Sequence, residues 1–179
     1  MPETDARNEI PGPTLSSALK ALSDAGVDFV ICGGVACILH GVNRVTADLD
    51  LAVRLDHDNL ARFVQAARRL QLRPRIPEPL ESLLDPHKRQ VWIEQKHAQV
   101  FTLVSSSGPF QIDIFLTYPI AFDDLKSRAN VMVGADVTLH VSSKEDLITA
   151  KRAAGREQDQ RDIHDLERLL QDERRRQRS

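Results

Sequence analysis

Two aspartates stand one residue apart in the apolar stretch DLDLAV, residues 48–53, and this spacing is the first sign of chemistry in the chain. Strand side chains alternate between faces, so Asp48 and Asp50 project on one side and the leucines on the other. Two carboxylates held this close repel each other unless a cation lies between them, and Mg²⁺ favours a few carboxylates together with water and substrate phosphates. The pair indicates a metal site, although a solvated strand edge or a turn would give the same pattern.

A third aspartate, Asp113, stands in the later apolar run QIDIFL, residues 111–116. Ile112 and Ile114 take one face of a strand, so Asp113 shares the other face with Phe115. On a strand beside the first pair, Asp113 would complete a three-carboxylate cradle for two Mg²⁺ or Mn²⁺ ions. A surface position on an amphipathic strand is the alternative that the sequence leaves open.

Two adjacent glycines, Gly33 and Gly34, follow the apolar run FVIC. Glycines after a strand let the backbone approach a phosphate closely, and the next helix offers its N-terminal amides. We expect these glycines to hold the phosphates of a nucleoside triphosphate whose other end meets the metals. Arg44 and Thr46, in the linker before the acidic pair, are placed either to reach the nucleotide or to hold the loop. A plain tight turn is the alternative for the glycines alone.

The elements that position these residues alternate in type along the chain. We expect helices over 14–25, 35–40, 58–70 and 122–128, strands over 29–32, 48–53, 91–94, 100–104, 111–116, 131–133 and 137–141, and an irregular proline-studded connection over 72–87. Two closing helices follow; the first opens with Ser142 and Glu145 at capping-box spacing and ends at Gly155. The mixture predicts an α+β fold, with a mixed β-sheet flanked by helices and the C-terminal helices packed on it.

Length and composition restrict the class of protein. The chain has 179 residues, 24 basic against 26 acidic side chains and 41% hydrophobic residues, which is typical of a globular protein without a global bias toward nucleic acid or membrane. Two cysteines and no long apolar segment favour a cytoplasmic protein with no membrane partner. We expect a disordered N-terminal segment over 1–13, a core over 14–141 and a C-terminal helical segment over 142–179.

The stretch GGVACILHGVNRVTADLDLAV resembles the signature of the nucleotidyltransferase superfamily with the polymerase-beta-like fold. That signature is an apolar residue, two small residues, a helix, and then Asp-apolar-Asp-apolar. Gly33, Gly34, Asp48 and Asp50 match it position for position, and Asp113 is the candidate for the superfamily's third carboxylate. The resemblance implies transfer of a nucleoside monophosphate from a nucleoside triphosphate to an acceptor hydroxyl, with two Mg²⁺ or Mn²⁺ ions.

The later segment VSSKEDLITAKRAAGREQDQRDIHDLERLL is similar to a segment of the AbiEii-like toxin nucleotidyltransferases and their relatives. Its matching positions are Asp146, Lys151, Arg156, Asp159 and Asp162. The ammonium of Lys151 either snorkels to solvent or points into a cleft, where it would balance the charge of the leaving pyrophosphate. The resemblance favours the cleft and implies that Lys151 is a catalytic and nucleotide-binding residue. We expect Asp159 and Asp162, with Arg156, to have a supporting role that orients the basic residues, and Asp146 to be a helix cap or a surface charge.

The acceptor and the biological role stay open at this point. The toxin-like resemblance implies RNA such as tRNA, or a protein side chain, and a toxin–antitoxin system with a cognate antitoxin. A likeness in the linker before the acidic pair implies an antibiotic-modifying enzyme instead. A non-catalytic interaction module is the third alternative, supported by the lack of an obvious nucleobase pocket. The candidate RNA patch is a basic run near the proline-rich connection: Arg68, Arg69, Arg73, Arg75, Lys88 and Arg89.

Overall fold

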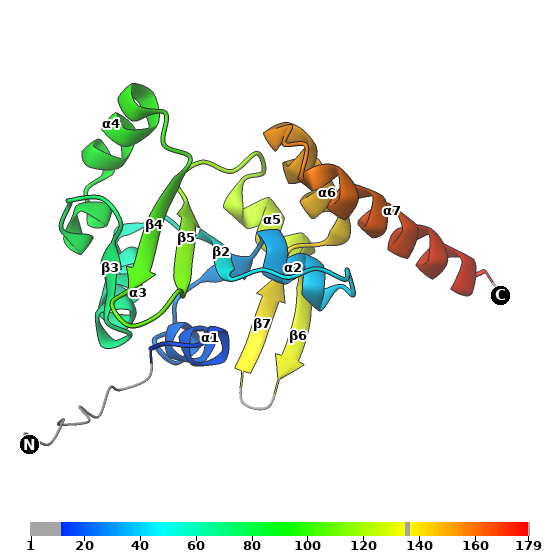
Figure 1. The fold of residues 1–179 in the computed structure, drawn as a ribbon, viewed down its shortest axis with the longest axis horizontal. Coiled ribbons are helices and arrows are strands. Elements are labelled where there is room, and N and C mark those ends of the chain that lie inside the picture. The colour runs from blue at the N-terminus through cyan, green and yellow to red at the C-terminus, as the bar shows by residue number, and fades with distance from the viewer. Residues whose placement is uncertain (1–11, 135–136, 179) are drawn as a thin grey trace, which may run out of the picture.

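The strands of the protein form one mixed sheet (Figure 1). The computed structural model describes residues 12–134 and 137–178, so most of the N-terminal segment 1–13, expected to be disordered, lies outside the described residues. The seven strands of the described chain lie in the order β3-β4-β5-β2-β1-β7-β6. They are β1 (Phe29–Ile31), β2 (Asp48–Val53), β3 (Leu72–Pro74), β4 (Val100–Ser105), β5 (Gln111–Phe115), β6 (Asn130–Gly134) and β7 (Val137–Val141).

Two of the strand pairings are parallel and the others are antiparallel. β1 runs parallel to β7, and β2 runs parallel to β5. The pairs β1–β2, β3–β4, β4–β5 and β6–β7 are antiparallel. The expected α+β fold with a mixed sheet is therefore confirmed.

Helices flank this sheet, and the last two of them lie side by side (Figure 1). They are α1 (Leu15–Asp24), α2 (Gly33–Leu39), α3 (His57–Arg69), α4 (Pro86–Lys96), α5 (Phe122–Arg128), α6 (Lys144–Ala154) and α7 (Asp159–Arg176), with a short 3₁₀ helix at Leu80–Leu84. The orange-to-red helix α7 runs from α6 out to the C-terminal end of the chain (Figure 1).

The two faces of the central strands differ in chemistry, as side-chain alternation requires. Leu49, Leu51, Ile112 and Ile114 are fully buried on one face, in the main hydrophobic core that also contains Phe63 of α3. The opposite face carries the aspartates of β2 and β5. Burial of the leucines and isoleucines thus fixes which way the carboxylates point.

The expected strand over 91–94 is wrong, because these residues lie inside α4. Asp85 caps this helix by accepting hydrogen bonds from the backbone N–H groups of His87 and Lys88, and Pro86 takes the first helical position, where its missing N–H costs nothing. Trp92 is buried and stacks on Phe101, with ring centroids 5.0 Å apart. A short run such as VWIE, with three apolar residues, cannot distinguish a strand from one buried face of a helix.

Other expected boundaries also shift. The stretch 72–87, expected to be irregular, contains β3, the 3₁₀ helix and the start of α4. Helix α2 begins at Gly33 rather than at residue 35. The N-cap of α6 is Ser143, whose hydroxyl accepts from the backbone N–H of Asp146, so the expected Ser142–Glu145 capping box is displaced by one residue.

One buried polar residue, Asn59 of α3, joins the helix to the ends of two strands. Its side-chain oxygen accepts from the backbone N–H of Asp28 at 2.7 Å, and its amide group donates to the carbonyl oxygens of Asp28 and Arg54 at 2.9 Å. Three backbone groups thus bond to one side chain. The N–H of Asp28 and the carbonyl of Arg54 would lose this partner if the amide were removed, whereas the carbonyl of Asp28 also accepts from the N–H of Arg54 at 3.1 Å. An unpaired buried polar group is costly.

We expect Asn59→Ala to lower the free energy of unfolding by about 2–4 kcal/mol, because it leaves buried backbone groups unpaired and opens a small cavity. Urea denaturation followed by circular dichroism measures this. Gln65→Ala, an exposed position of the same helix, is the control and should change stability by less than about 0.5 kcal/mol. Equal effects of the two substitutions would contradict the role given to Asn59.

Candidate active site

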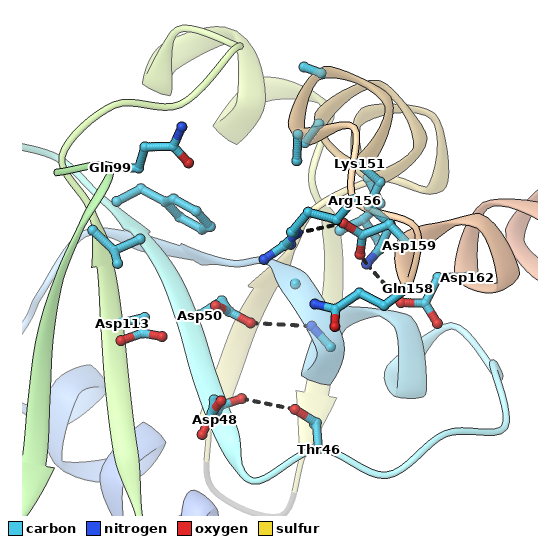
Figure 2. Close-up of a pocket in the computed structure, with 18 of the residues that line it drawn as sticks. Thr46, Asp48, Asp50, Gln99, Asp113, Lys151, Arg156, Gln158, Asp159 and Asp162 are labelled. Atoms are coloured by element: carbon cyan, nitrogen blue, oxygen red, sulfur yellow. Dashed lines mark hydrogen bonds and ion pairs between the residues drawn. The ribbon is translucent and has the colours of Figure 1, made fainter. Parts of the chain in front are cut away.

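The parallel register of β2 and β5 brings the acidic residues together. Asp50 lies directly beside Asp113, and Asp48 lies beside Gln111. Because residues two apart on a strand share a face, all three carboxylates project from the same side of the sheet (Figure 2). The structure thus places Asp113 on the strand next to the acidic pair.

The two glycines at the start of α2 make room for the side chains around them. Gly33 has φ +57°, and a Cβ there would lie 1.9 Å from Oδ2 of Asp50. A Cβ on Gly34 would lie 2.8 Å from Oγ1 of Thr46 and 3.1 Å from Cζ of Arg44. The backbone N–H of Gly34 donates to Oδ2 of Asp50 at 3.3 Å. The start of α2 therefore contacts the carboxylate of Asp50 directly.

The electrostatics of the acidic face favour protonation of one carboxylate. Burial raises the pKa of Asp50 to about 6, and repulsion from Asp113 and Asp48 adds to this, against the hydrogen bond from Gly34. Asp113 accepts from the side-chain amide of Gln111 at 3.1 Å with one oxygen, while its other oxygen, Oδ1, is buried without a partner. Both features mark a site that lacks positive charge.

The donor chemistry of this face fits a hard divalent cation, because carboxylate oxygens are the ligands that Mg²⁺ and Mn²⁺ prefer. The unpartnered Oδ1 of Asp113 is a free ligand oxygen of that kind. Among residues 12–134 and 137–178, however, no group of three or more His, Cys, Asp or Glu side chains is placed so that it could hold a metal ion. Metal binding would therefore require the carboxylates to turn toward one another.

A cluster of positive and negative side chains lies where α6 meets α7, and it lines the same cavity as the aspartates. The ammonium of Lys151 donates to Asp159 at 2.8 Å and to Asp162 at 2.7 Å. Arg44 pairs with Asp162, and Arg156 donates to Asp159 at 2.8 Å. The five residues, which we call the ionic cluster, join the linker before β2 to both C-terminal helices.

Lys151 is held inside this cluster. Its side chain is only 6% exposed. Burial alone would lower its pKa, but the hydrogen bonds to Asp159 and Asp162 raise it above the ordinary value. Its ammonium is thus engaged by two carboxylates. By contrast, the side chain of Arg156 is 60% exposed, and its charge opposes the rise in the pKa of Asp50.

Asp146 differs from the expectation of a cap or surface charge. It is buried, and both of its oxygens accept from the guanidinium of Arg128, at 3.0 to 3.2 Å. It is the backbone N–H of Asp146, not its carboxylate, that takes part in capping α6. Arg128 closes α5, and nothing in the local sequence pattern of either residue predicts a pairing over 18 positions.

The acidic face and the ionic cluster border one cavity of about 870 Å³. Its lining includes every site residue proposed from the sequence: Gly33, Gly34, Arg44, Thr46, Asp48, Asp50, Asp113, Lys151, Arg156, Asp159 and Asp162. It also includes residues that sequence reasoning missed, among them Gln99, Phe115, Tyr118 and Ala150. Strand alternation already puts Phe115 on the face of Asp113, but Gln99, Tyr118 and Ala150 carry no motif, and only tertiary structure brings them to the cavity.

The basic run near the proline-rich connection is mostly paired within the protein. Arg68 contacts Glu81, Lys88 contacts Glu78, and Arg75 contacts Gln111. Arg89 donates to the backbone oxygens of Leu83 and Leu55. Two of the six cations are thus paired with carboxylates, whereas the neutral partners of Arg75 and Arg89 leave those charges in place.

We expect Asp50→Asn to stabilise the metal-free protein at neutral pH. A folded-state pKa raised above the unfolded value means that stability falls as pH rises from about 4 through about 6. The substitution removes this loss. The free energy of unfolding of the variant should therefore exceed that of wild type by up to about 3 kcal/mol at pH 7.5 and by much less at pH 4. Urea denaturation in the presence of a chelator at both pH values measures the difference. A difference that does not change with pH would contradict the assignment.

We expect Lys151→Met to lower the free energy of unfolding by about 3–5 kcal/mol, because it removes the buried cation that Asp159 and Asp162 share and leaves each carboxylate with a single arginine. The neighbouring Arg152→Met is the control, since that residue makes an exposed ion pair with Glu167 and should cost less than about 1 kcal/mol. Thermal and urea unfolding of the two variants give the comparison. If both variants lose the same free energy of unfolding, Lys151 stabilises the fold no more than an exposed ion pair does.

Among the described residues, no helix combines the length and the apolar character that a membrane span needs. A comparison with the curated proteins gave no match. A family model described as "Nucleotidyl transferase AbiEii toxin, Type IV TA system" matches residues 17–178, which include the acidic face, both glycines and the ionic cluster. The chain therefore belongs to the AbiEii family of nucleotidyltransferase toxins of type IV toxin–antitoxin systems.

Proposed function

We propose that the protein transfers a nucleoside monophosphate from a nucleoside triphosphate to an acceptor hydroxyl, with Mg²⁺ or Mn²⁺. The observation that carries this proposal is the register that sets Asp50 beside Asp113, on one face and next to the glycine start of α2. The family supplies the reaction class, and the geometry supplies the residues.

Asp48, Asp50 and Asp113 would hold two metal ions. When bound, such ions neutralise the phosphates, lower the pKa of the acceptor hydroxyl and steady the leaving group. The raised pKa of Asp50 and the unpartnered oxygen of Asp113 support this assignment, because both would be relieved by added positive charge. Asn at any of the three positions would keep the shape and remove the charge.

The chain's own groups would then guide the transfer. The acceptor oxygen attacks the α-phosphorus and forms the new phosphorus–oxygen bond, while the bond to the bridging oxygen between the α- and β-phosphates breaks and pyrophosphate leaves. The carboxylate of Asp113 would take the proton of the acceptor hydroxyl. The N–H of Gly34, now bonded to Asp50, would bind a phosphate oxygen once that carboxylate turns to the metal.

The cations of the ionic cluster would have different roles. Arg156 lines the cavity and its side chain is 60% exposed, so we assign it to the phosphates or the pyrophosphate. Arg44 and Thr46 lie against Gly34 and would bind the nucleotide from the linker. Lys151 would act mainly by fixing α6 and α7 through Asp159 and Asp162, and its charge would reach the phosphates only at a distance.

The acceptor is proposed to be a macromolecule, either RNA such as tRNA or a protein hydroxyl, and the toxin to have a cognate antitoxin. This rests on the family, whose description is that of toxins in toxin–antitoxin systems. Antibiotic modification and a non-catalytic role are the two alternatives. The assay below distinguishes each of them from transfer to RNA or protein.

We expect wild-type protein with Mg²⁺ or Mn²⁺ to move label from an α-labelled nucleoside triphosphate, and not from a γ-labelled one, onto RNA or protein from a cell extract. Asp48→Asn and Asp50→Asn should each lower the rate by at least about 10³-fold, because both remove metal-binding charge. Asp123→Asn, an exposed carboxylate in a surface ion pair with Arg54, is the control and should leave the rate unchanged.

The distribution of label identifies the reaction. Label on RNA or protein supports the proposed acceptor class, whereas label on an added aminoglycoside alone would indicate an antibiotic-modifying enzyme. A folded wild-type protein that transfers nothing with any of the four nucleotides and either metal would refute the transferase and favour an interaction module.

A further inference from the structure

The cavity has a second end that the proposed chemistry does not use. Beyond the carboxylates, its lining changes to Phe115 and Tyr118 on one wall and to Leu147, Ala150 and Ala154 of α6 on the other. We call the space between these two walls the apolar slot. Nothing in the acid–metal chemistry explains why an apolar slot should continue from the acidic face.

The first wall is fixed relative to the reacting residues by the strand itself. Phe115 lies two residues after Asp113 on β5, so the two side chains share a face and their Cα atoms are about 7 Å apart along the strand. Tyr118 packs edge-on against the ring of Phe115, with centroids 4.8 Å apart and an interplanar angle of 60°. This contact holds the Phe115 ring in one place beside the acidic face.

The second wall is made of small side chains at helical spacing. Leu147, Ala150 and Ala154 follow the i, i+3, i+7 pattern, so they share one side of α6. Alanine reaches only one carbon from the backbone, and any larger side chain at Ala150 or Ala154 would project into the slot. The two walls together leave a space suited to a flat ring.

A polar group stands at the edge of the slot. Gln99 lies just before β4, and its backbone oxygen accepts from the N–H groups of Leu116 and Thr117, which fixes it beside the end of β5. Its side chain lines the cavity (Figure 2) and makes no hydrogen bond within the described residues. A carboxamide offers one acceptor and two donors, so it can pair with the edge of a heterocycle.

We propose that the apolar slot binds the nucleobase of the nucleoside triphosphate, with the ring between Phe115 and the alanines of α6 and the base edge at the amide of Gln99. The inference rests on the proposed function, because the base must be joined to an α-phosphate at the acidic face. An aromatic wall, a flat apolar wall and one amide at the edge match the shape and chemistry of a base.

The test compares each nucleoside triphosphate with inorganic triphosphate, which has the phosphates but no base. Calorimetric titration with Mn²⁺ gives the dissociation constants. Wild type should bind at least one nucleoside triphosphate about tenfold or more tightly than inorganic triphosphate. Ala150→Leu should fill the slot and remove most of this advantage, while the affinity for inorganic triphosphate stays within about twofold.

Thr149→Leu adds the same side chain to the neighbouring exposed position of α6, which does not line the cavity, and should leave both affinities unchanged. If Ala150→Leu does not fold, Ala154→Leu, at an exposed position of the same wall, takes its place. Thermal unfolding of every variant checks that the fold is kept.

Gln99→Glu tests the edge of the slot. A carboxylate only accepts hydrogen bonds, so it should favour guanine, whose N1–H and amino group both donate, relative to cytosine, which presents one donor beside two acceptors. We expect the ratio of the two nucleotide affinities, each first corrected for the change in affinity for inorganic triphosphate, to shift by about tenfold. A ratio that does not shift would remove Gln99 from the base site.

The outcomes separate this inference from the proposed function. If wild type binds inorganic triphosphate and nucleoside triphosphates equally, the phosphate site stands and the slot does not hold the base. If Ala150→Leu lowers transfer without changing nucleotide affinity, the slot holds the acceptor and the inference is overturned. If wild type binds none of these ligands, the proposed function fails, and the inference fails with it.

Discussion

Repulsion among three carboxylates on one face of the sheet is the constraint around which the site is arranged. The parallel pairing of β2 with β5 sets Asp50 beside Asp113, and burial of the intervening aliphatic residues on the opposite face prevents either from turning away. Without a metal, the protein offsets this repulsion with the N–H of Gly34, with the distant charge of Arg156 and with partial protonation of Asp50. The folded state thus holds an acidic site under electrostatic strain that a cation would relieve.

The ionic cluster, with three cations and two anions, lines the same cavity as the acidic face. Asp159 and Asp162, from the first turn of α7, bind Lys151 of α6, and one arginine joins the cluster from each side. The buried ammonium of Lys151 has few alternative partners, so the cluster helps to fix where α7 starts relative to the linker before β2.

Much of the acidic site follows from the sequence because its signals are local. Alternation places Asp48 and Asp50 on one face, and the same rule puts Asp113 on the outward side of its strand. Residues that depend on long-range contacts carry no such signal. Gln99 reaches the cavity through the pairing of β4 with the end of β5, which no local pattern records.

The errors have the same origin. The mostly apolar segment 91–94 fits a strand locally. Asp85 and Pro86, however, start the helix that contains it, and Trp92 packs on Phe101. Asp146 has the spacing of a surface residue near a helix start, yet Arg128 binds it from another helix in a buried pair. In each case a tertiary contact decides between two conformations or positions that the local sequence leaves nearly equal.

The glycine pair shows how a motif can have two physical causes at once. Phosphate binding alone would explain Gly33 and Gly34, but the ligand-free structure already requires them: the first has a positive φ and lies against Asp50, and the second lies against Thr46 and Arg44. A chain that had lost catalysis would still need both glycines as long as those neighbours remained. Packing of α2 against β2 and the linker before it is therefore enough to explain the glycine motif. The unpartnered oxygen of Asp113, by contrast, has no such packing explanation.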